Sequence, residues 1–471
     1  MKENVLLVYA PMDDYYYTEG VNDSPPLGLV ALQNYVLRNE GLRVKVDIID
    51  GEYHDLQEIC EMIDQGDYDL VGIQPMMASY SNTLGILQKA KEKGITTVMG
   101  GHHATHLADR IIKNRSGLVD FIIVGDGEEA FASLVKEEPP ERIPNLVYLH
   151  PETREVVCNE TRNVPIDDGK IDYIDEKVLQ QYRNGNHKTL ERGEALASFR
   201  AYSHKGCSNR LNSQYCFFCG RADRGVRFKK PEVYLEELKY LAGMPSVRYV
   251  FEIGDDFLQS GEWLARLCEL KEKHMPGNGM HLKIFARANR ITPEIIDYLK
   301  RLDIDEVAIG FESGSEKILR NINKHASPAD NLRAAELLYS HGIDTIASFV
   351  LGLPGEDKES LAKTYEQAQR VAELSYKYLH KAPQEVIANL IEINPGSPAY
   401  RKVERHLPQK YSQADSLDVR EVQDDYFRVE FGLKSPGEIE AFRRELAAWG
   451  QAINRLGQYT YPAGWRRGDL A

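Results

Sequence analysis

The sequence contains little cysteine and no long apolar run, and these two absences limit what the protein can be. Six cysteines among 471 residues are far fewer than the dense disulfide framework of a small secreted domain requires. No apolar run approaches the roughly 20 residues that a membrane-spanning helix needs. The opening residues, MKENVLLVYAP, lack the basic and apolar segments of a secretion signal. We therefore expect a cytoplasmic protein without a membrane partner.

An excess of positive charge is absent as well. The chain has 58 Lys and Arg against 72 Asp and Glu, which gives a formal net charge of −14. The phosphate backbone of nucleic acids does not attract such a chain, so we expect no nucleic-acid partner. The hydrophobic fraction of 42% and the charged fraction of 28% are ordinary for a globular protein, and the length suffices for two or three domains.

Three of the six cysteines lie close together, in the run SHKGCSNRLNSQYCFFCGR. Cys207, Cys216 and Cys219 supply three thiolates, and an iron–sulfur cluster with three protein ligands leaves one iron open to a substrate or cofactor. The alternative is zinc, which needs a fourth ligand such as His204. The remaining cysteines stand in apolar surroundings, where free cysteine is usually a core residue; they are Cys60, Cys158 and Cys268.

Strands and helices alternate over residues 1–138. Short apolar runs typical of buried parallel strands are followed by helical segments. The expected strands are 4–10, 44–50, 70–74 and 96–101, the expected helices are 27–41, 56–66 and 82–94, and a strand runs into a helix over 121–130. This alternation predicts a doubly wound, Rossmann-like parallel sheet that binds ligands beyond the carboxyl ends of its strands.

Small and polar residues follow three of these strands, at the edge where a ligand would bind. Isolated glycines often do no more than make tight turns, but three such sites at one sheet edge favour binding. The candidates are Ser79 and Ser81 after the third strand, Gly100, Gly101, His102 and His103 after the fourth, and Gly125, Asp126, Gly127 and Glu128 after the fifth.

Residues 139–195 interrupt the alternation and are expected to form a linker. A proline-marked connection leads into a small strand pair, and a polar loop follows over 182–195. Strand and helix then alternate again over 196–400, which predicts a (β/α)6 partial TIM barrel with strands at 196–202, 247–257, 281–289, 305–313, 344–352 and 385–394. Residues 401–471 are expected to form a helical, polar C-terminal region.

In such a barrel the functional residues lie on loops at the carboxyl ends of the strands. Besides the cysteine loop, the candidates there are Gly254, Asp255, Asp256, Arg287, Glu312, Ser313, Leu351, Gly352 and Pro354. Simpler alternatives stay open for some of them. Asp255 and Asp256 can serve as solvated turn residues, and Arg287 can be a structural ion-pair partner.

Eight short segments, in order along the chain, resemble motifs of one enzyme family. They are PPLGL (25–29), GGHHAT (100–105), VGDGEEA (124–130), GCSNR…CFFC (206–219), FEIGDDF (251–257), VAIGFESGSEKILRNINK (307–324), LGLPGE (351–356) and NPGSP (394–398). Together they resemble the radical S-adenosylmethionine (SAM) enzymes that carry an amino-terminal cobalamin-binding domain. The resemblance covers residues 1–135 and 196–400.

The resemblance implies the cofactors and their ligands. Cys207, Cys216 and Cys219 would hold a 4Fe–4S cluster whose open iron is chelated by the amino and carboxylate groups of SAM. An electron passed into the sulfonium then yields methionine and a 5'-deoxyadenosyl radical. Phe218 precedes the last cysteine, as in the family. The resemblance also implies the SAM contacts by position. These are Gly254 and Asp255 for the amino group, Glu312 and Ser313 for the ribose and amino-acid part, and Leu351 to Pro354 for the adenine.

The spacing of the cysteines departs from the family pattern. The family has Cys-x3-Cys-x2-Cys, whereas this chain has Cys-x8-Cys-x2-Cys, as if LNSQY (211–215) had been inserted. Loop-closure entropy grows slowly with length, so the longer loop costs only about half a kcal/mol and all three ligands remain. We expect the inserted residues to reshape what covers the open iron.

The cobalamin prediction concerns the first domain. The run Asp-x-His-x-x-Gly, which supplies a lower histidine ligand to cobalt in other cobalamin proteins, is absent. The resembling subgroup usually lacks that histidine, so its absence does not argue against cobalamin. His103 is a candidate contact of the corrin, and the alternative is a loop histidine bonded to the backbone.

Three readings of the function follow, and we favour the first. It is a radical SAM enzyme that acts on a small-molecule metabolite by cobalamin-dependent methylation of an unactivated carbon. The second is a cobalamin-independent radical dehydration, epimerisation, cyclisation or ring contraction, which the unusual cysteine loop favours. The third is a non-catalytic protein that binds a metal and a nucleotide. Either enzyme needs a reducing partner such as flavodoxin or ferredoxin, and a closed substrate cavity between the domains.

Overall fold

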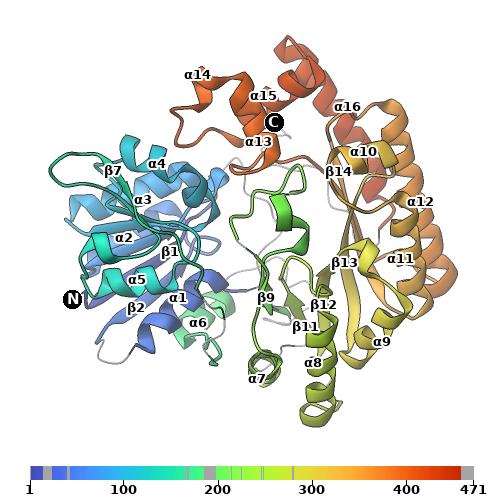
Figure 1. Ribbon diagram of the computed structural model, residues 1–471, viewed down its shortest axis with the longest axis horizontal. Helices are drawn as coiled ribbons and strands as arrows, with labels where there is room; N and C mark the ends of the chain where they lie inside the picture. The colour runs from blue at the N-terminus through green and yellow to red at the C-terminus, as the bar shows by residue number, and fades with distance from the viewer. Residues whose placement is uncertain are drawn as a thin grey trace.

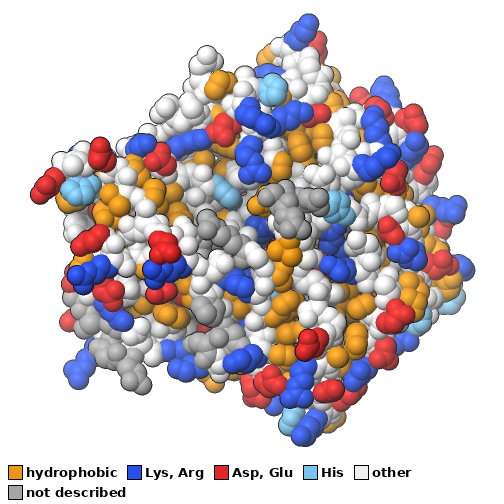
Figure 2. All heavy atoms as spheres, in the orientation of Figure 1, with side chains coloured by type: hydrophobic (Ala, Val, Ile, Leu, Met, Phe, Trp, Pro, Cys, Tyr) orange, Lys and Arg blue, Asp and Glu red, His pale blue; other side chains and the backbone are white. Residues whose placement is uncertain are grey.

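The computed structural model describes residues 2–13, 24–39, 43–164, 166, 169–184, 198–213, 215–223, 225–244, 247, 249–277 and 280–457. Two α/β units lie side by side, with the helices of residues 398–431 above them and the helix of 436–454 along the second unit (Figure 1). Most of the polar loop expected over 182–195 lies outside the described residues. Acidic and basic side chains are interspersed over much of the face in Figure 2.

The first unit is the expected doubly wound sheet. Its strands are β1 (Asn4–Tyr9), β2 (Lys45–Asp50), β3 (Leu70–Gln74), β4 (Thr96–Met99), β5 (Phe121–Ile123), β6 (Leu146–Leu149) and β7 (Val156–Cys158), in the order β2-β1-β3-β4-β5-β6-β7. The first five pair in parallel, and Val5 to Val8 of β1 are buried on both faces, as their continuous apolar run predicts. The order reverses between β1 and β3, so ligands are expected beyond their carboxyl ends.

The sheet extends beyond residue 138. Strands β6 and β7 come from the segment expected to be a linker; β6 pairs antiparallel with β5, and β7 pairs antiparallel with β6. Because Val147 of β6 pairs with Ile122 of β5 and both side chains are buried, this hairpin belongs to the domain core. Cys158 ends β7 at the sheet edge and is exposed, which corrects the prediction of a core cysteine there. Cys268 is buried as predicted, and Cys60 is half-buried.

Helices cover both faces of this sheet. They are α1 (Leu27–Leu37), α2 (Leu56–Gln65), α3 (Tyr80–Glu92), α4 (Gly101–Asn114) and α5 (Glu128–Val135). Helix α2 begins with a capping box in which the Asp55 side chain accepts from the Glu58 N–H and the Glu58 side chain accepts from the Asp55 N–H. A further helix from the expected linker, α6 (Glu176–Asn184), lies against β2, where the Gln181 amide donates to the Ile48 carbonyl at 2.8 Å.

The second unit is the expected partial barrel. Its strands β8 (Ser198–Ala201), β11 (Tyr249–Glu252), β12 (His281–Ala286), β13 (Ile304–Glu312), β14 (Asp344–Leu351) and β15 (Glu385–Leu390) pair in parallel in chain order and form an open six-stranded sheet. The helices that cover it are α7 (Pro231–Ala242), α8 (Gly261–His274), α9 (Pro293–Arg301), α10 (Glu316–Asn321), α11 (Pro328–Ser340) and α12 (Lys358–Leu379). A short antiparallel pair that the sequence did not predict, β9 (His204–Lys205) and β10 (Arg227–Phe228), encloses the cysteine loop.

The C-terminal region is helical, as predicted. It contains α13 (Pro398–His406), α14 (Pro408–Tyr411), α15 (Val419–Phe431) and α16 (Pro436–Asn454). Helix α16 lies along the edge strand β15, where the Asn454 side-chain oxygen accepts from the Ala388 N–H at 2.6 Å. The same region reaches the first domain, because the Tyr80 hydroxyl of α3 donates to Asp415 at 2.9 Å. In the part of the chain that the structure describes, no helix is both long and apolar enough to cross a membrane.

Candidate active site between the two domains

A cavity of about 910 Å³ lies between the two domains. The first domain lines it with residues that follow β3, β4 and β5, and the second domain lines it with the β9–β10 hairpin and the turn after β11. Of the residues predicted from the sequence, it brings together Gly101, Gly125, Asp126, Gly127, Glu128, Gly254 and Asp255. The predicted ligand edges of both sheets therefore face one common space.

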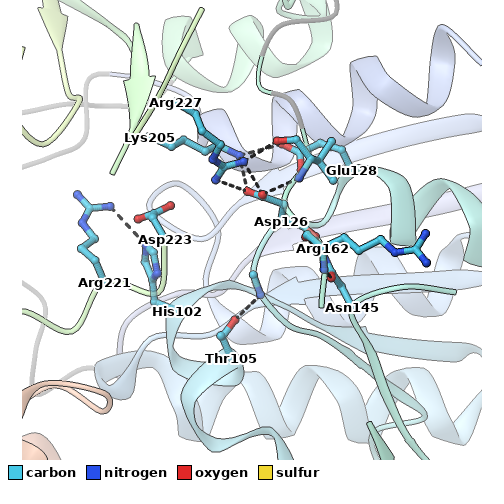
Figure 3. A network of polar contacts seen from close by, with 12 residues as sticks. His102, Thr105, Asp126, Glu128, Asn145, Arg162, Lys205, Arg221, Asp223 and Arg227 are labelled. Carbon is cyan, nitrogen blue, oxygen red and sulfur yellow. Dashed lines mark hydrogen bonds and ion pairs between the residues drawn. The ribbon is translucent and has the colours of Figure 1, made fainter. Parts of the chain in front are cut away.

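Asp126 and Glu128 bind two cations of the barrel domain across this cavity wall. Arg227 of β10 donates to both carboxylate oxygens of Asp126, at 2.6 and 3.1 Å, and Lys205 of β9 donates to Asp126 at 3.3 Å and to Glu128 at 3.0 Å (Figure 3). Burial works to raise the pKa of Asp126, but the bonds from Arg227 and the charge of Lys205 outweigh it and lower that pKa. These two predicted binding residues thus hold the domains together.

Two histidines of α4 also line the cavity: His102, which the sequence places among the polar residues after the fourth strand, and His106, which the sequence reasoning missed. His102 accepts at Nδ1 from the Ala222 N–H at 3.1 Å and lies beside Arg221, while His106 Nε2 is 2.9 Å from the Gly220 carbonyl oxygen (Figure 3 shows His102 and Arg221). Burial, together with the Arg221 charge, lowers the pKa of His102 to about 4, so its ring is neutral near pH 7. The signal for these residues is the spacing in GGHHATH, which puts positions 102 and 106 on one helix face.

Three other predicted residues of the first domain do not line the cavity. His103 is 6% exposed and packs against the Tyr80 ring, with centroids 5.1 Å apart, and burial lowers its pKa to about 4. Ser79 is buried and its hydroxyl accepts from the Met76 N–H at 2.9 Å, so it closes the turn before α3. Ser81 is exposed on α3. A corrin contact by any of these side chains stays a prediction.

The cysteine loop begins and ends at the β9–β10 hairpin. Gly206 has φ of +88°, and a Cβ there would lie 1.9 Å from the Gly225 carbonyl oxygen, so only glycine lets the two arms of the loop approach so closely. Residues Ser208–Ser213, which include part of the inserted segment, form a 3-10 helix. Phe217 ties the second half of the loop to the barrel, where its N–H donates to Ile322 O at 3.0 Å, and to α13, where its carbonyl accepts from Ala399 N–H at 2.9 Å.

Each of the three cysteine sulfurs faces an N–H donor. The backbone N–H of Asn209 is directed to Cys207, the Asn209 side-chain amide lies 3.1 Å from the Cys216 sulfur, and the backbone N–H of Arg221 is directed to Cys219. Burial raises the pKa of all three thiols, while nearby cations such as Lys324 and Arg287 act in the opposite sense at Cys216. Hydrogen-bond donors and positive charge around three thiolates suit an anionic iron–sulfur cluster.

His204, the fourth ligand that the zinc alternative needs, has other partners. His204 Nε2 accepts from the Asp256 N–H at 3.2 Å, its Nδ1 lies 2.9 Å from the Ser203 hydroxyl, and its ring stacks on Phe228. Both ring nitrogens are therefore engaged away from the cysteines. Among the residues with described positions, no three His, Cys, Asp or Glu side chains gather as a single metal ion would need. A cubane cluster binds through separate iron corners, so its thiolates stand further apart than around one ion.

The turn after β11 is shaped by close packing. Gly254 donates its N–H to Glu252 at 3.0 Å, and a Cβ at this position would lie 2.2 Å from the His204 ring. Asp255 faces the cavity beside Arg221, 3.2 Å from its Nε, and burial raises the Asp255 pKa. Asp256 is fully buried and lies 3.6 Å from Arg290, so it is not the solvated turn residue of the simpler alternative.

A cluster of buried polar side chains lies near the cysteines. It contains Arg287 after β12, Glu312 at the end of β13, and Lys324 after α10. Lys324 donates to Glu312 at 2.6 Å, and Arg287 donates to the Lys324 backbone carbonyl. Glu312 adopts the left-handed conformation, with φ of +60°, at a β-bulge of β13. Ser313 is fully buried, with its hydroxyl 3.0 Å from that of Thr364. Arg287 thus bonds a backbone carbonyl next to the cluster loop, and SAM contacts of these residues stay predictions.

The loop after β14 packs against the C-terminal helices. The Gly352 N–H donates to Glu356 at 2.6 Å, and the Gly352 carbonyl accepts from the Tyr426 hydroxyl at 3.0 Å. Leu351 is fully buried, and the Pro354 carbonyl accepts from the Asn321 amide at 2.8 Å. Phe218 is half-buried against the barrel core. None of these residues lines the cavity between the domains, and their contacts with SAM stay predictions.

Comparison with known families identifies two domains in the positions just described. The B12 binding domain family matches residues 17–135, and the Radical SAM superfamily matches residues 202–368. The radical SAM domain implies a 4Fe–4S cluster and SAM, and the B12 binding domain implies cobalamin. The first match contains the strand ends that line the cavity, and the second contains all three cysteines of the loop.

Curated relatives share these domains at low identity. An uncharacterized methyltransferase of Pyrococcus horikoshii is 24% identical over 376 residues, which cover 78% of each chain. An anaerobic magnesium-protoporphyrin IX monomethyl ester cyclase of Rubrivivax gelatinosus is 25% identical over 364 residues. That match covers 73% of this chain and 62% of the cyclase, so the chain spans less than two thirds of that relative.

Solved structures have the same fold. The radical SAM methyltransferase TsrM from Kitasatospora setae, with cobalamin and a 4Fe–4S cluster bound, matches with a TM-score of 0.66 and 16% identity, over 86% of this chain and 79% of its own. The cobalamin-dependent SAM radical enzyme OxsB, with aqua-cobalamin and SAM bound, matches with a TM-score of 0.67 and 16% identity, over 96% and 72%. With both domains present in this order, the chain belongs to the radical SAM enzymes that carry an amino-terminal B12 binding domain.

Proposed function

We propose that this enzyme is a cobalamin-dependent methyltransferase that adds a methyl group to an unactivated carbon of a small molecule. The observation that carries the proposal is the shared cavity. The B12 binding domain lines the cavity with residues at its strand ends, which are Gly100, Gly101 and Gly125 to Glu128. The barrel lines the same cavity with Gly254, Asp255 and residues on both sides of the cysteine loop. A substrate in that space would lie between the two cofactor sites. The methyltransferase of Pyrococcus horikoshii, similar over 78% of each chain, supports the same reaction.

The residues present fit the three groups that the domains imply. Cys207, Cys216 and Cys219 would hold the cluster, with an N–H donor at each sulfur. The glycine-rich ends of β4 and β5 leave room for a flat, bulky corrin at the cavity wall. When bound, these groups supply reductive cleavage of SAM and a methyl group carried on cobalt.

The chain's own side chains would position and shield the substrate. Asp126 and Glu128 are bonded to Lys205 and Arg227, which closes one side of the cavity between the domains. His102 and His106 are neutral near pH 7 because burial lowers the pKa of both, so they present uncharged polar groups to the substrate. These two rings add no charge of their own to a wall whose acidic and basic side chains are paired with one another.

Two further features complete the proposal. The electron would come from a flavodoxin or ferredoxin, since a 4Fe–4S cluster that cleaves SAM is reduced one electron at a time. The protein would work in the cytoplasm, where thiols stay reduced. The six cysteines, all free thiols in the structure, support that location.

The test is anaerobic reconstitution with iron, sulfide and hydroxocobalamin, followed by metal analysis and SAM turnover. About four irons and about one cobalt per chain are expected if one cubane and one corrin bind. Methyl transfer further requires that S-adenosylhomocysteine form together with 5'-deoxyadenosine, and that its formation depend on cobalt. Four irons without cobalt, with 5'-deoxyadenosine as the only nucleoside product, would overturn the methyltransferase proposal.

A variant of one cysteine tests the cluster itself. Cys216→Ala removes one of three iron ligands and is expected to abolish 5'-deoxyadenosine formation while circular dichroism stays unchanged. Cys60→Ala is the matched control, because Cys60 is a half-buried thiol on α2, outside the cavity. Retention of 5'-deoxyadenosine formation by Cys216→Ala would contradict the ligand assignment.

The second candidate is a cobalamin-independent radical rearrangement or cyclisation. The observation that favours it is the cysteine loop, in which residues Ser208–Ser213 form an extra 3-10 turn beside the cavity. The similarity to the Rubrivivax gelatinosus cyclase agrees with a reaction other than methyl transfer. The cobalt analysis above separates the two candidates.

A further inference from the structure

We propose that the side-chain amide of Asn209 is a hydrogen-bond donor to the iron–sulfur cluster that raises its reduction potential and holds Cys216 in place. Asn209 would be a positioning residue, since it acts on the cluster through a cysteine ligand. The inference rests on the cluster and does not depend on which reaction follows SAM cleavage.

Asn209 lies between two of the cluster ligands. Its backbone N–H is directed to the sulfur of Cys207, two residues earlier, and Arg221 gives the same backbone contact to Cys219. At Cys216 the donor is a side chain, because Nδ2 of Asn209 lies 3.1 Å from the sulfur. This bond can therefore be removed by substitution, whereas the two backbone bonds cannot.

The amide of Asn209 has a fixed orientation. The residue is 9% exposed, and Nδ2 also donates to the Asn323 carbonyl at 3.2 Å. The neighbouring side chain of Arg210 donates to the carbonyls of Arg221 and Asp223, at 2.6 and 2.8 Å. Two side chains therefore hold the segment between Cys207 and Cys216 in place. Asn209 bonds it to the barrel, and Arg210 bonds it to the segment that follows Cys219.

These ties compensate for the unusual spacing of the cysteines. Eight residues separate Cys207 from Cys216, and a loop of this length brings its ends together at a greater entropic cost than a loop of three residues. Asn209 bonds both cysteines, with its backbone to one and its side chain to the other. It therefore fixes the distance between two ligands that the chain length alone leaves free.

The same bond changes the electronic environment of the cluster. An N–H donor draws negative charge from the thiolate and favours the reduced cluster, which carries one more electron. A hydrogen bond to a charged group is about twice as strong as one between neutral groups. Loss of this donor should therefore make the cluster harder to reduce.

The experiment is a redox titration of the reconstituted holoenzyme, followed by electron paramagnetic resonance of the reduced cluster. Asn209→Leu keeps the side-chain size and removes the donor. We expect the midpoint potential to become more negative by about 59 mV or more, which corresponds to a tenfold change in a one-electron equilibrium. Asn209→Asp also removes the donor and adds a negative charge, so its shift should be at least as large in the same direction.

The control is Asn331→Leu. Asn331 is a buried amide on α11, 1% exposed, which donates to the Phe311 carbonyl at 3.1 Å and contacts none of the cysteines. This variant should lose thermal stability and keep the wild-type potential. Such a result separates the sulfur bond from the general effect of removing a buried amide.

Each outcome decides the inference. An unchanged midpoint in Asn209→Leu with about four irons bound would overturn it. If Asn209→Leu binds no iron, an unchanged potential in Asn209→Asp overturns the inference, because both the lost donor and the added charge should lower it. If neither variant binds iron although both are folded, the result supports the part of the inference in which Asn209 holds Cys216 in place. A wild-type protein without iron would instead contradict the cluster assignment.

Discussion

The ion pair between Asp126 and Arg227 is expected to join the two domains, and a double-mutant cycle can measure it. The variants are Asp126→Asn, Arg227→Met and the two combined. Two hydrogen bonds, of 2.6 and 3.1 Å, connect the side chains, which are only 7% and 18% exposed. Charge-assisted bonds in such a setting contribute about 1.5–3 kcal/mol, so we expect a coupling of about 2 kcal/mol.

The Arg227→Met variant does not leave the charge of Asp126 unpaired, which limits its cost. Without Arg227, Asp126 keeps the Val164 N–H at 2.9 Å and Lys205 at 3.3 Å. The cost should therefore fall below the 3–5 kcal/mol seen for an abandoned buried charge, at about 2–3 kcal/mol. For a domain of this size that corresponds to a fall of roughly 4–12 °C in the melting transition.

The assay is scanning calorimetry of the whole chain, read at the transition that includes the first domain. The pKa of Asp126 is lowered in the folded protein, so its contribution is complete above the ordinary value of 3.8 and is lost only as pH falls below that. The coupling should thus be constant between about pH 5 and pH 8. Arg162→Met, which removes an exposed arginine paired with exposed Glu160, should leave the transition unchanged. Additive effects of the two single variants would refute the reasoning.

Two further predictions concern the barrel. Gly254→Ala should abolish SAM binding in equilibrium dialysis, because its Cβ would lie 2.2 Å from the His204 ring. Gly261→Ala, at a position with open space around it, is the control, and normal SAM binding by Gly254→Ala would contradict the packing argument. Burial raises the pKa of Glu356 to about 7 from 4.5, so the folded protein should lose stability as pH rises through this range. Glu356→Gln should flatten that loss in thermal melts at about pH 5 and pH 8; an equal slope in both proteins would exclude Glu356 as its source.

The sequence predicted the two sheets well because parallel strands leave a strong local signal. The run Asn4–Tyr9 is apolar in every central position, since helices cover both faces of the strand. Helix ends were less predictable: α1 ends at Leu37, although the sequence suggested residue 41. The hairpin β6–β7 was recognised as a strand pair, but its pairing with β5 joins segments far apart in the chain and leaves no local pattern.

The site was predictable where one residue type has few uses. Three clustered cysteines and the glycines after β4 and β5 indicated cofactors from the sequence alone. The ion pairs of Asp126 could not be predicted from the sequence. Its partners Arg227 and Lys205 lie 101 and 79 positions away, and charged residues are common in loops. Ser79 shows why a polar residue at a strand end is ambiguous, since its hydroxyl also accepts a hydrogen bond within a local turn.

The cysteine loop begins on β9 and ends on β10, and Asp126 of the other domain binds a side chain of each strand. Lys205 on β9 and Arg227 on β10 both donate to Asp126. The barrel therefore cannot be treated as an exchangeable module. If it were excised, or joined to the B12 binding domain of a relative, both ends of the loop would lose their common partner. A chimera would need an acidic residue at the position of Asp126, and natural recombination between such enzymes should preserve this trio as one inherited unit.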